Sequence, residues 1–156
     1  MSIEKVTAYL RERGAADKIR IFDVSSATVE LAAKALGTQE ARIAKSMAFL
    51  VGEAPVIIVT AGDMKIDNAK FKAMFHTKAK MLTPDELPIL IGHAMGGVCP
   101  FAVNDGCTVY LDDSLKRFDT VYPAAGSANS AVELTVDELQ TLSNSLQWVD
   151  VCKPRK

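Results

Sequence analysis

Two apolar segments, at residues 45–51 and 55–61, follow one another with only the turn Gly52-Glu53-Ala54 between them. Each is of strand length and contains the β-branched and large apolar residues that favour strands. Two strands joined by so short a turn pair with each other as an antiparallel hairpin. The sequence therefore predicts a central β-hairpin, around which the other elements are arranged.

The other segments alternate between helical and strand patterns. Asp67 is placed to cap a helix, and Thr83 with Glu86 and Thr135 with Glu138 have the spacing of capping boxes. Short alternating runs predict strands. Together the patterns predict helices at 3–13, 28–36, 67–75, 83–91 and 135–144, and strands at 19–24, 101–103, 108–111, 120–122, 131–134 and 148–151.

This order of elements predicts one α+β or mixed-sheet domain that spans residues 1–156 and whose sheet closes partly into a barrel. No Gly-x-Gly-x-x-Gly motif follows a strand, so a dinucleotide-binding fold is not expected. The last four residues, 153–156, are expected to fray.

The composition is that of an ordinary soluble globular chain. The 156 residues are 49% hydrophobic and 24% charged, with a formal net charge of −1. That charge excludes a strongly basic nucleic-acid coat, but it does not exclude a local basic patch. The apolar runs are too short to span a bilayer, and the N-terminus has no signal-peptide pattern. We therefore expect a cytoplasmic protein without membrane contact.

Cysteine and histidine leave two interpretations open. Cys99, Cys107 and Cys152 match no zinc-ligand spacing, and we expect neither a metal nor another cofactor. His93 and Cys99 are close enough in sequence to raise the question of a Cys–His nucleophile. The other interpretation is a small buried thiol beside a proline, and we favour it for Cys99.

Residues 92–101, which we call the glycine loop, contain Gly96-Gly97-Val98-Cys99-Pro100. Glycine can adopt positive φ and lets a ligand approach main-chain N–H groups, and proline fixes the local backbone. We expect positive φ at Gly97. The loop either presents main-chain donors to a ligand or forms only a tight turn into a strand.

Lys45 opens the first hairpin strand, just before a mostly apolar segment. Its ammonium either extends to solvent or points into a cleft. Residues 126–130, the second loop, are small and polar, and form either a turn or a ligand site in which Asn129 donates a hydrogen bond. No two carboxylates are spaced as a catalytic dyad. A lysine that faces main-chain donors suits an anionic or ester-containing ligand.

In their order, these segments resemble the YbaK family, which includes the editing insertion domain of bacterial prolyl-tRNA synthetase and its free-standing relatives. The resemblance extends from about Thr28 to Leu142. The segments that carry it are 28–37, Ile43-Ala44-Lys45-Ser46-Met47-Ala48-Phe49, 62–67, Gly96-Gly97-Val98-Cys99-Pro100-Phe101, 109–112, Gly126-Ser127 and 134–139.

The resemblance implies a mixed α+β fold around a mainly antiparallel, barrel-like sheet with peripheral helices. It also implies hydrolysis of the ester that joins a wrongly attached small amino acid to the terminal adenosine of a tRNA. The implied partners are a tRNA acceptor end, of tRNA-Pro or a related tRNA, and an aminoacyl-tRNA synthetase.

The same resemblance implies residue roles. Lys45 falls on the family's essential lysine, which holds the terminal adenosine or phosphate, and Gly96 and Gly97 fall on the loop that approaches the scissile carbonyl. No side-chain nucleophile is implied, because water attacks with help from the terminal ribose hydroxyl. Cys99 stands where relatives have other small residues, which concerns amino-acid specificity. The substrate-binding residues expected are Met47, His93, Val98, Cys99, Pro100, Phe101, Gly126, Ser127 and Asn129.

Two other functions are compatible with these residues. A non-catalytic module would bind a nucleotide or aminoacyl end without turnover, although the intact Lys45 and Gly96-Gly97 argue against a decayed site. A thiol hydrolase or oxidoreductase would depend on Cys99 and would be sensitive to iodoacetamide. Deacylation of mischarged tRNA distinguishes the non-catalytic module, and iodoacetamide tested beside a Cys99→Ala variant distinguishes the thiol-dependent enzyme.

Overall fold

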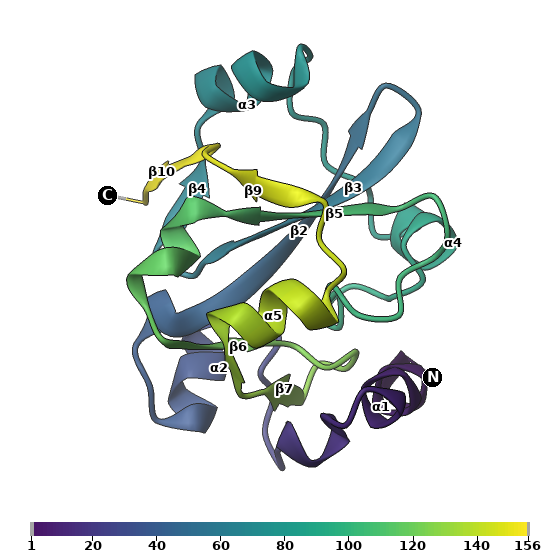
Figure 1. The fold of residues 1–156 in the computed structure, drawn as a ribbon, viewed down its shortest axis with the longest axis vertical. Coiled ribbons are helices and arrows are strands. Elements are labelled where there is room, and N and C mark those ends of the chain that lie inside the picture. The colour runs from purple at the N-terminus through teal and green to yellow at the C-terminus, as the bar shows by residue number, and fades with distance from the viewer. Residues whose placement is uncertain (1, 156) are drawn as a thin grey trace.

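The computed structural model describes residues 2–155, and its fold is built on the predicted hairpin (Figure 1). Strand β2 (Ile43–Val51) pairs antiparallel with β3 (Ala54–Ala61), which confirms that prediction. The two strands are the middle pair of a six-stranded sheet with the order β8-β6-β2-β3-β5-β9.

The remaining elements surround this hairpin. No helix within residues 2–155 has the length and apolar character that crossing a bilayer requires. The helices are α1 (Ser2–Glu12), α2 (Val29–Leu36), α3 (Asn68–Phe75), α4 (Glu86–Leu90) and α5 (Val136–Leu142), with 3-10 turns η1 (Ala16–Lys18), η2 (Glu40–Arg42) and η3 (Asp113–Arg117). The other strands are β1 (Ile19–Ile21), β4 (Met64–Ile66), β5 (Thr108–Asp112), β6 (Thr120–Pro123), β7 (Ser130–Val132), β8 (Leu134–Thr135), β9 (Gln147–Val149) and β10 (Cys152–Pro154).

The sheet is mixed. In the six-stranded sheet β2–β3 and β6–β8 are antiparallel, whereas β2–β6, β3–β5 and β5–β9 are parallel. The pairs β1–β7 and β4–β10 form two small antiparallel sheets. The mixed α+β fold with a curled, barrel-like sheet is therefore confirmed (Figure 1). Parallel pairing is more frequent in the main sheet than expected, because the long connection 62–107 returns the chain to β3 in the same direction.

The two faces of the hairpin bury different clusters. Leu10 of α1 and Leu139 of α5 pack in the main core with Ile57 of β3. On the other face, beneath α3, the rings of Phe49 and Phe71 pack with centroids 5.2 Å apart. Since successive side chains of a strand point to opposite faces, β3 contributes to both clusters and joins them.

Helix caps lie where the sequence predicts them. Asp67 accepts hydrogen bonds from the first N–H groups of α3, and Thr135 and Glu138 form a capping box at α5. Thr83 and Glu86 exchange the same pair of hydrogen bonds, although α4 is assigned only from Glu86 onward.

Two expectations are wrong. Residues 101–103 are irregular rather than a strand, because Ala102 adopts a φ of +54°, which a strand does not allow. The C-terminal tail does not fray over its described part: β10 pairs with β4, and the N–H of Arg155 donates to the Asp63 carbonyl at 3.0 Å. The edge of β4 supplies the pairing partner that no local pattern could indicate.

Asp112, at the end of β5, is a buried carboxylate that holds the C-terminal segment in place. The residue is 1% exposed. Its Oδ2 accepts the N–H of Ser114 at 2.9 Å, and its Oδ1 accepts the N–H of Val151 at 3.0 Å. Two buried main-chain donors therefore depend on one side chain.

Replacing Asp112 with alanine should destabilise the fold strongly. Each buried donor left without an acceptor costs about 1–3 kcal/mol, so Asp112→Ala should lower the free energy of unfolding by roughly 2–5 kcal/mol, measured by urea titration. The control is Asp113→Ala, since Asp113 is exposed and pairs with Lys116 at 3.1 Å. That change should cost less than about 1 kcal/mol, and equal effects of the two substitutions would contradict the assignment.

Candidate functional site

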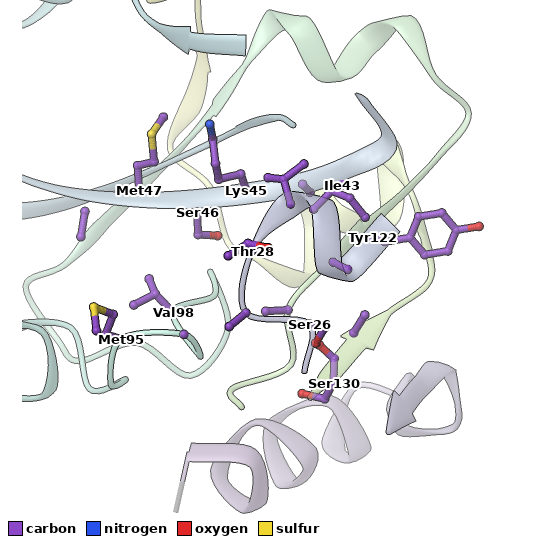
Figure 2. Close-up of a pocket in the computed structure, with 18 of the residues that line it drawn as sticks. Ser26, Thr28, Ile43, Lys45, Ser46, Met47, Met95, Val98, Tyr122 and Ser130 are labelled. Carbon is purple, nitrogen blue, oxygen red and sulfur yellow. The ribbon is translucent and has the colours of Figure 1, made fainter. Parts of the chain in front are cut away.

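A cavity of about 350 Å³ lies beside β2, between the start of α2, the glycine loop and the segment 81–87 (Figure 2). Its wall is mainly apolar and contains several alanines and valines. A largely apolar cavity with a few polar groups is the usual form of a small-molecule site. The polar side chains that line it belong to Ser26, Thr28, Lys45, Ser46, Tyr122 and Ser130.

The cavity exists because one edge of β2 is only partly covered. Strand β6 pairs with β2 at Ile43 and Ala44 alone. Farther along the same edge, the carbonyl of Ala48 accepts the N–H of Leu82 at 3.0 Å. Between these two stretches lies Ser46, beside which no strand runs within residues 2–155.

Ser46 turns three polar groups toward this gap. Alternate residues of a strand point their N–H and C=O groups to the same edge, so those of Ser46 point the same way as those of Ala44 and Ala48. The Ser46 Oγ is buried and has no hydrogen-bond partner in residues 2–155. Its side chain lies on the side of Thr28 and Val98 (Figure 2). A buried polar atom without a partner is rare in folded proteins.

Lys45 lies on the opposite face of β2, together with Met47 (Figure 2). Both line the cavity, and the Lys45 Nζ donates a hydrogen bond to the Met64 carbonyl at 3.0 Å. Burial lowers the pKa of Lys45, and the nearby Arg155 cation lowers that pKa further. The ammonium is thus partly desolvated, a condition in which a nearby anion stabilises it.

The glycine loop meets the second loop backbone to backbone. A Cβ on Gly97 would lie 2.7 Å from the carbonyl oxygen of Gly126 and 3.0 Å from the nitrogen of Ser127. The expectation of positive φ at Gly97 is wrong, because Gly96 has that conformation, with φ +90°. Gly97 is required instead by the close approach of the second loop.

The main-chain donors of the glycine loop differ in availability. The N–H of Gly97 donates to the carbonyl of Ala94 at 3.0 Å, within the loop itself. Among the described residues, the N–H groups of Gly96 and Val98 have no hydrogen-bond partner. Gly96 and Val98 also line the cavity. The donors available to a ligand are therefore those on either side of Gly97.

The second loop is held by its own polar contacts and by hydrogen bonds to the segment 22–26. The Ser127 Oγ donates to Asn129 Oδ1 at 2.9 Å and lies 2.6 Å from the Ser130 Oγ. The Asn129 amide donates to the Phe22 carbonyl at 3.1 Å. Gly126, Ser127 and Asn129 are not among the residues that line the cavity, whereas the next residue, Ser130, lines it.

His93, Cys99 and Phe101 are fully buried behind the glycine loop. The His93 Nε2 lies 2.7 Å from the Phe101 carbonyl and therefore carries the proton. The Cys99 Sγ lies 3.6 Å from that same nitrogen, which cannot then accept the thiol proton. Burial raises the pKa of Cys99 to about 12 and lowers the pKa of His93. Pro100, also buried, borders a separate cavity.

The sequence and the fold are both shared with known proteins. The profile of the aminoacyl-tRNA editing domain matches residues 24–142. The uncharacterized protein YwhH of Bacillus subtilis (strain 168) is 49% identical over 154 residues, which are 98% of each chain. The chain belongs to the aminoacyl-tRNA editing domain family.

Solved structures agree with this assignment. A protein proposed as a trans-editing enzyme for prolyl tRNA synthetase matches with a TM-score of 0.88 and 28% identity over 97% of both chains. The hypothetical protein APE2540 matches with a TM-score of 0.84 and 25% identity, over 96% of this chain and 99% of that one. The predicted resemblance to YbaK-like editing proteins is confirmed.

The cavity of this editing domain includes polar residues that the sequence analysis did not select. The alternation along β2 would have indicated Ser46, which follows Lys45 directly. Ser26, Tyr122 and Ser130 come from segments far apart in the sequence, and no local pattern brings them together. They meet only through the long-range packing of the editing fold.

A larger residue at position 97 should separate the two loops. Gly97→Val should lower the free energy of unfolding by roughly 1–3 kcal/mol, because main-chain atoms of Gly126 cannot give way as a flexible side chain can. The same substitution should shift the amide resonances of Gly126 and Ser127 in a ¹⁵N-correlated NMR spectrum.

Ala94→Val, an exposed change in the same loop, is the matched control and should alter stability by no more than about 0.5 kcal/mol. Unchanged resonances of the second loop in Gly97→Val would show that the loops do not depend on each other.

Proposed function

We propose that this editing domain is a trans-editing hydrolase, which removes a small, wrongly attached amino acid from a tRNA after a synthetase has released it. The observation that carries the proposal is the cavity at the open edge of β2, bordered by the desolvated Lys45 and by the unpaired donors of the glycine loop. Family membership supports an editing reaction. The structural relative proposed to act for prolyl tRNA synthetase supports tRNA-Pro or a related tRNA.

Lys45 is proposed to anchor the end of the tRNA. The terminal adenosine carries a phosphate and ribose hydroxyls, which are good partners for an ammonium whose one hydrogen bond within residues 2–155 goes to the Met64 carbonyl at 3.0 Å. A lysine acts as a compact point charge and suits a single phosphate better than base recognition. Anion binding would also offset the desolvation that lowers the pKa of Lys45.

The glycine loop is proposed to stabilise the oxyanion. Water attacks the ester carbonyl carbon, the bond from that carbon to the ribose oxygen breaks, and the ribose oxygen leaves with a proton relayed from the water. The N–H groups of Gly96 and Val98 have no other partner among the described residues. One main-chain donor at an oxyanion is worth about 10²–10³ in rate.

The preference for a small amino acid is proposed from the family resemblance. Ala32, Ala44, Ala48 and Val98 give the cavity an apolar wall, which suits a small side chain without charge. Differences of one methylene group in such a pocket are worth about 1–3 kcal/mol. Alanine, serine and cysteine are the candidates that we propose.

The proposed reaction also implies a cellular location, a substrate and a partner enzyme. Residues 1–156 are proposed to act as a single cytoplasmic domain, with a tRNA acceptor end as substrate and an aminoacyl-tRNA synthetase as the supplier of the mischarged tRNA. A panel of purified mischarged tRNAs tests the function. Release of one amino acid supports the proposal, and binding without release would instead support a non-catalytic module.

Removing the ammonium at position 45 should nearly abolish turnover. Lys45→Ala should lower kcat/KM for the preferred mischarged tRNA by at least about 100-fold, the loss expected when a reacting group is no longer positioned. Lys45→Arg should restore little, because the planar guanidinium has a different geometry. Single-turnover deacylation measures both effects.

The control for this experiment is Lys116→Ala, which removes an exposed lysine paired with Asp113. It should leave turnover unchanged, and urea titration should show that the Lys45 variants remain folded. Full activity of a folded Lys45→Ala protein would refute the anchoring role.

Cys99 should not be the nucleophile. Its pKa of about 12 keeps the sulfur protonated near neutral pH, and only the thiolate attacks. Cys99→Ala should therefore keep deacylase activity within about tenfold of wild type for at least one small amino acid, since Cys99 is buried behind the glycine loop and does not line the cavity. Iodoacetamide at pH 7 should not inhibit the wild-type enzyme. Loss of activity on every substrate in a folded variant, or a trapped thioester on Cys99, would establish cysteine catalysis.

A further inference from the structure

We propose that the gap in the edge of β2 is the subsite for the α-amino and carbonyl groups of the substrate, and that Ser46 is the residue that recognises them. The inference rests on the proposed function for the identity of the substrate. It specifies which groups of the aminoacyl ester bind to the edge of β2 and which esters are poor substrates.

An aminoacyl group has the polar pattern of one strand residue, with a nitrogen donor on one side of the α-carbon and a carbonyl acceptor on the other. In an antiparallel pair, two opposed residues exchange two such hydrogen bonds. Ser46 presents the complementary N–H and C=O at the gap between the β6 pairing and the Leu82 contact. The aminoacyl group can thus complete the edge as an added residue, in the manner of β-strand addition.

The Ser46 hydroxyl supplies a third contact. Three other hydroxyls that line the cavity already have partners: Thr28 Oγ1 accepts the N–H of Leu31 at 3.1 Å, Ser130 Oγ lies 2.6 Å from Ser127 Oγ, and Ser26 Oγ donates to the Ser130 carbonyl at 3.5 Å. The Ser46 Oγ is buried and has no partner in residues 2–155. Leaving such an atom unsatisfied costs free energy that a bound N–H donor would recover.

The charge of the cavity fits recognition by neutral oxygens. Among the described residues that line it, none is aspartate or glutamate, so no carboxylate competes for an amino group. Lys45 projects from the opposite face of β2 and donates to Met64, which separates its charge from the Ser46 hydroxyl (Figure 2). Both the ammonium and the amine form of the substrate carry N–H donors for the carbonyl and Oγ of Ser46.

The N–H of Ser46 faces the scissile carbonyl in this arrangement. It would join the donors of the glycine loop in stabilising the oxyanion, because a carbonyl oxygen accepts two hydrogen bonds. An ester without a free α-amino group loses the contacts to the Ser46 carbonyl and Oγ. Propionyl-tRNA, which differs from alanyl-tRNA by that group alone, should therefore be a poor substrate.

Kinetics of two matched esters test the subsite. Ser46→Ala should lower kcat/KM for alanyl-tRNA by about tenfold, the worth of one hydrogen bond to a charged donor, and should change propionyl-tRNA by less than about twofold. Ser26→Ala, which removes another hydroxyl of the cavity wall, should preserve the wild-type ratio of the two esters. Equal losses for both esters in Ser46→Ala, or equal turnover of both by wild type, would overturn the proposal.

Binding without turnover separates this inference from the proposed function. In a ¹⁵N-correlated NMR titration, L-alaninamide should shift the amide resonance of Ser46, and propionamide at equal concentration should not. The Ser46 shift without any tRNA deacylation would refute the hydrolase and retain the subsite. Deacylation of alanyl-tRNA with no Ser46 shift by L-alaninamide would retain the hydrolase and refute the subsite.

Discussion

Strand β2 is hydrogen-bonded to β3 on one side, but its other edge is covered only in part, by β6 at one end and by the segment before α4 at the other. An uncovered strand edge leaves N–H and C=O groups without partners, and proteins usually cover or protect such edges. Here the interruption is centred on Ser46 and opens into a cavity. The cavity and the unpaired main-chain groups of Ser46 both depend on this interruption.

Close backbone packing positions the glycine loop, which forms one wall of the cavity. A Cβ on Gly126 would lie 2.8 Å from the Ser2 carbonyl of α1, and one on Gly97 would lie 2.7 Å from the Gly126 carbonyl. Helix α1, the second loop and the glycine loop are thus in close contact, through main-chain atoms and, at Gly126, also through the Val6 side chain of α1. Because rigid main-chain atoms set the spacing, the loop that carries Gly96 and Val98 is held at a fixed distance from α1, which helps to hold the cavity wall in place.

Local signals explain what the sequence could predict. The hairpin depends on a short turn between apolar runs, and the caps at Asp67 and Thr135 depend on residues within one helical turn. The resemblance to a family added Lys45 and the glycine loop, which line the cavity with Met47 and Val98.

Long-range contacts explain what the sequence could not predict. The pairing of β10 with β4 joins segments about 90 residues apart, and the close approach of Gly97 to Gly126 joins two loops across the fold. The spacing of His93 and Cys99 could not show whether the two side chains meet. It also could not show which His93 nitrogen carries the proton, and that position of the proton makes the pair inert. The alternation along β2 places Ser46 beside Lys45 in the sequence, but the gap in the strand edge that distinguishes this serine is visible only in the fold.

Burial has opposite consequences for the two reactive side chains near the cavity. It keeps Cys99 as a neutral thiol, with a pKa of about 12, whereas it leaves Lys45 a desolvated cation that gains from an anion. An aminoacyl ester is already an activated acyl donor, so its hydrolysis requires positioning and oxyanion stabilisation more than a strong nucleophile. Fixed main-chain donors and one anchoring charge meet those requirements. The arrangement therefore favours attack by water on a held ester over covalent catalysis by a side chain.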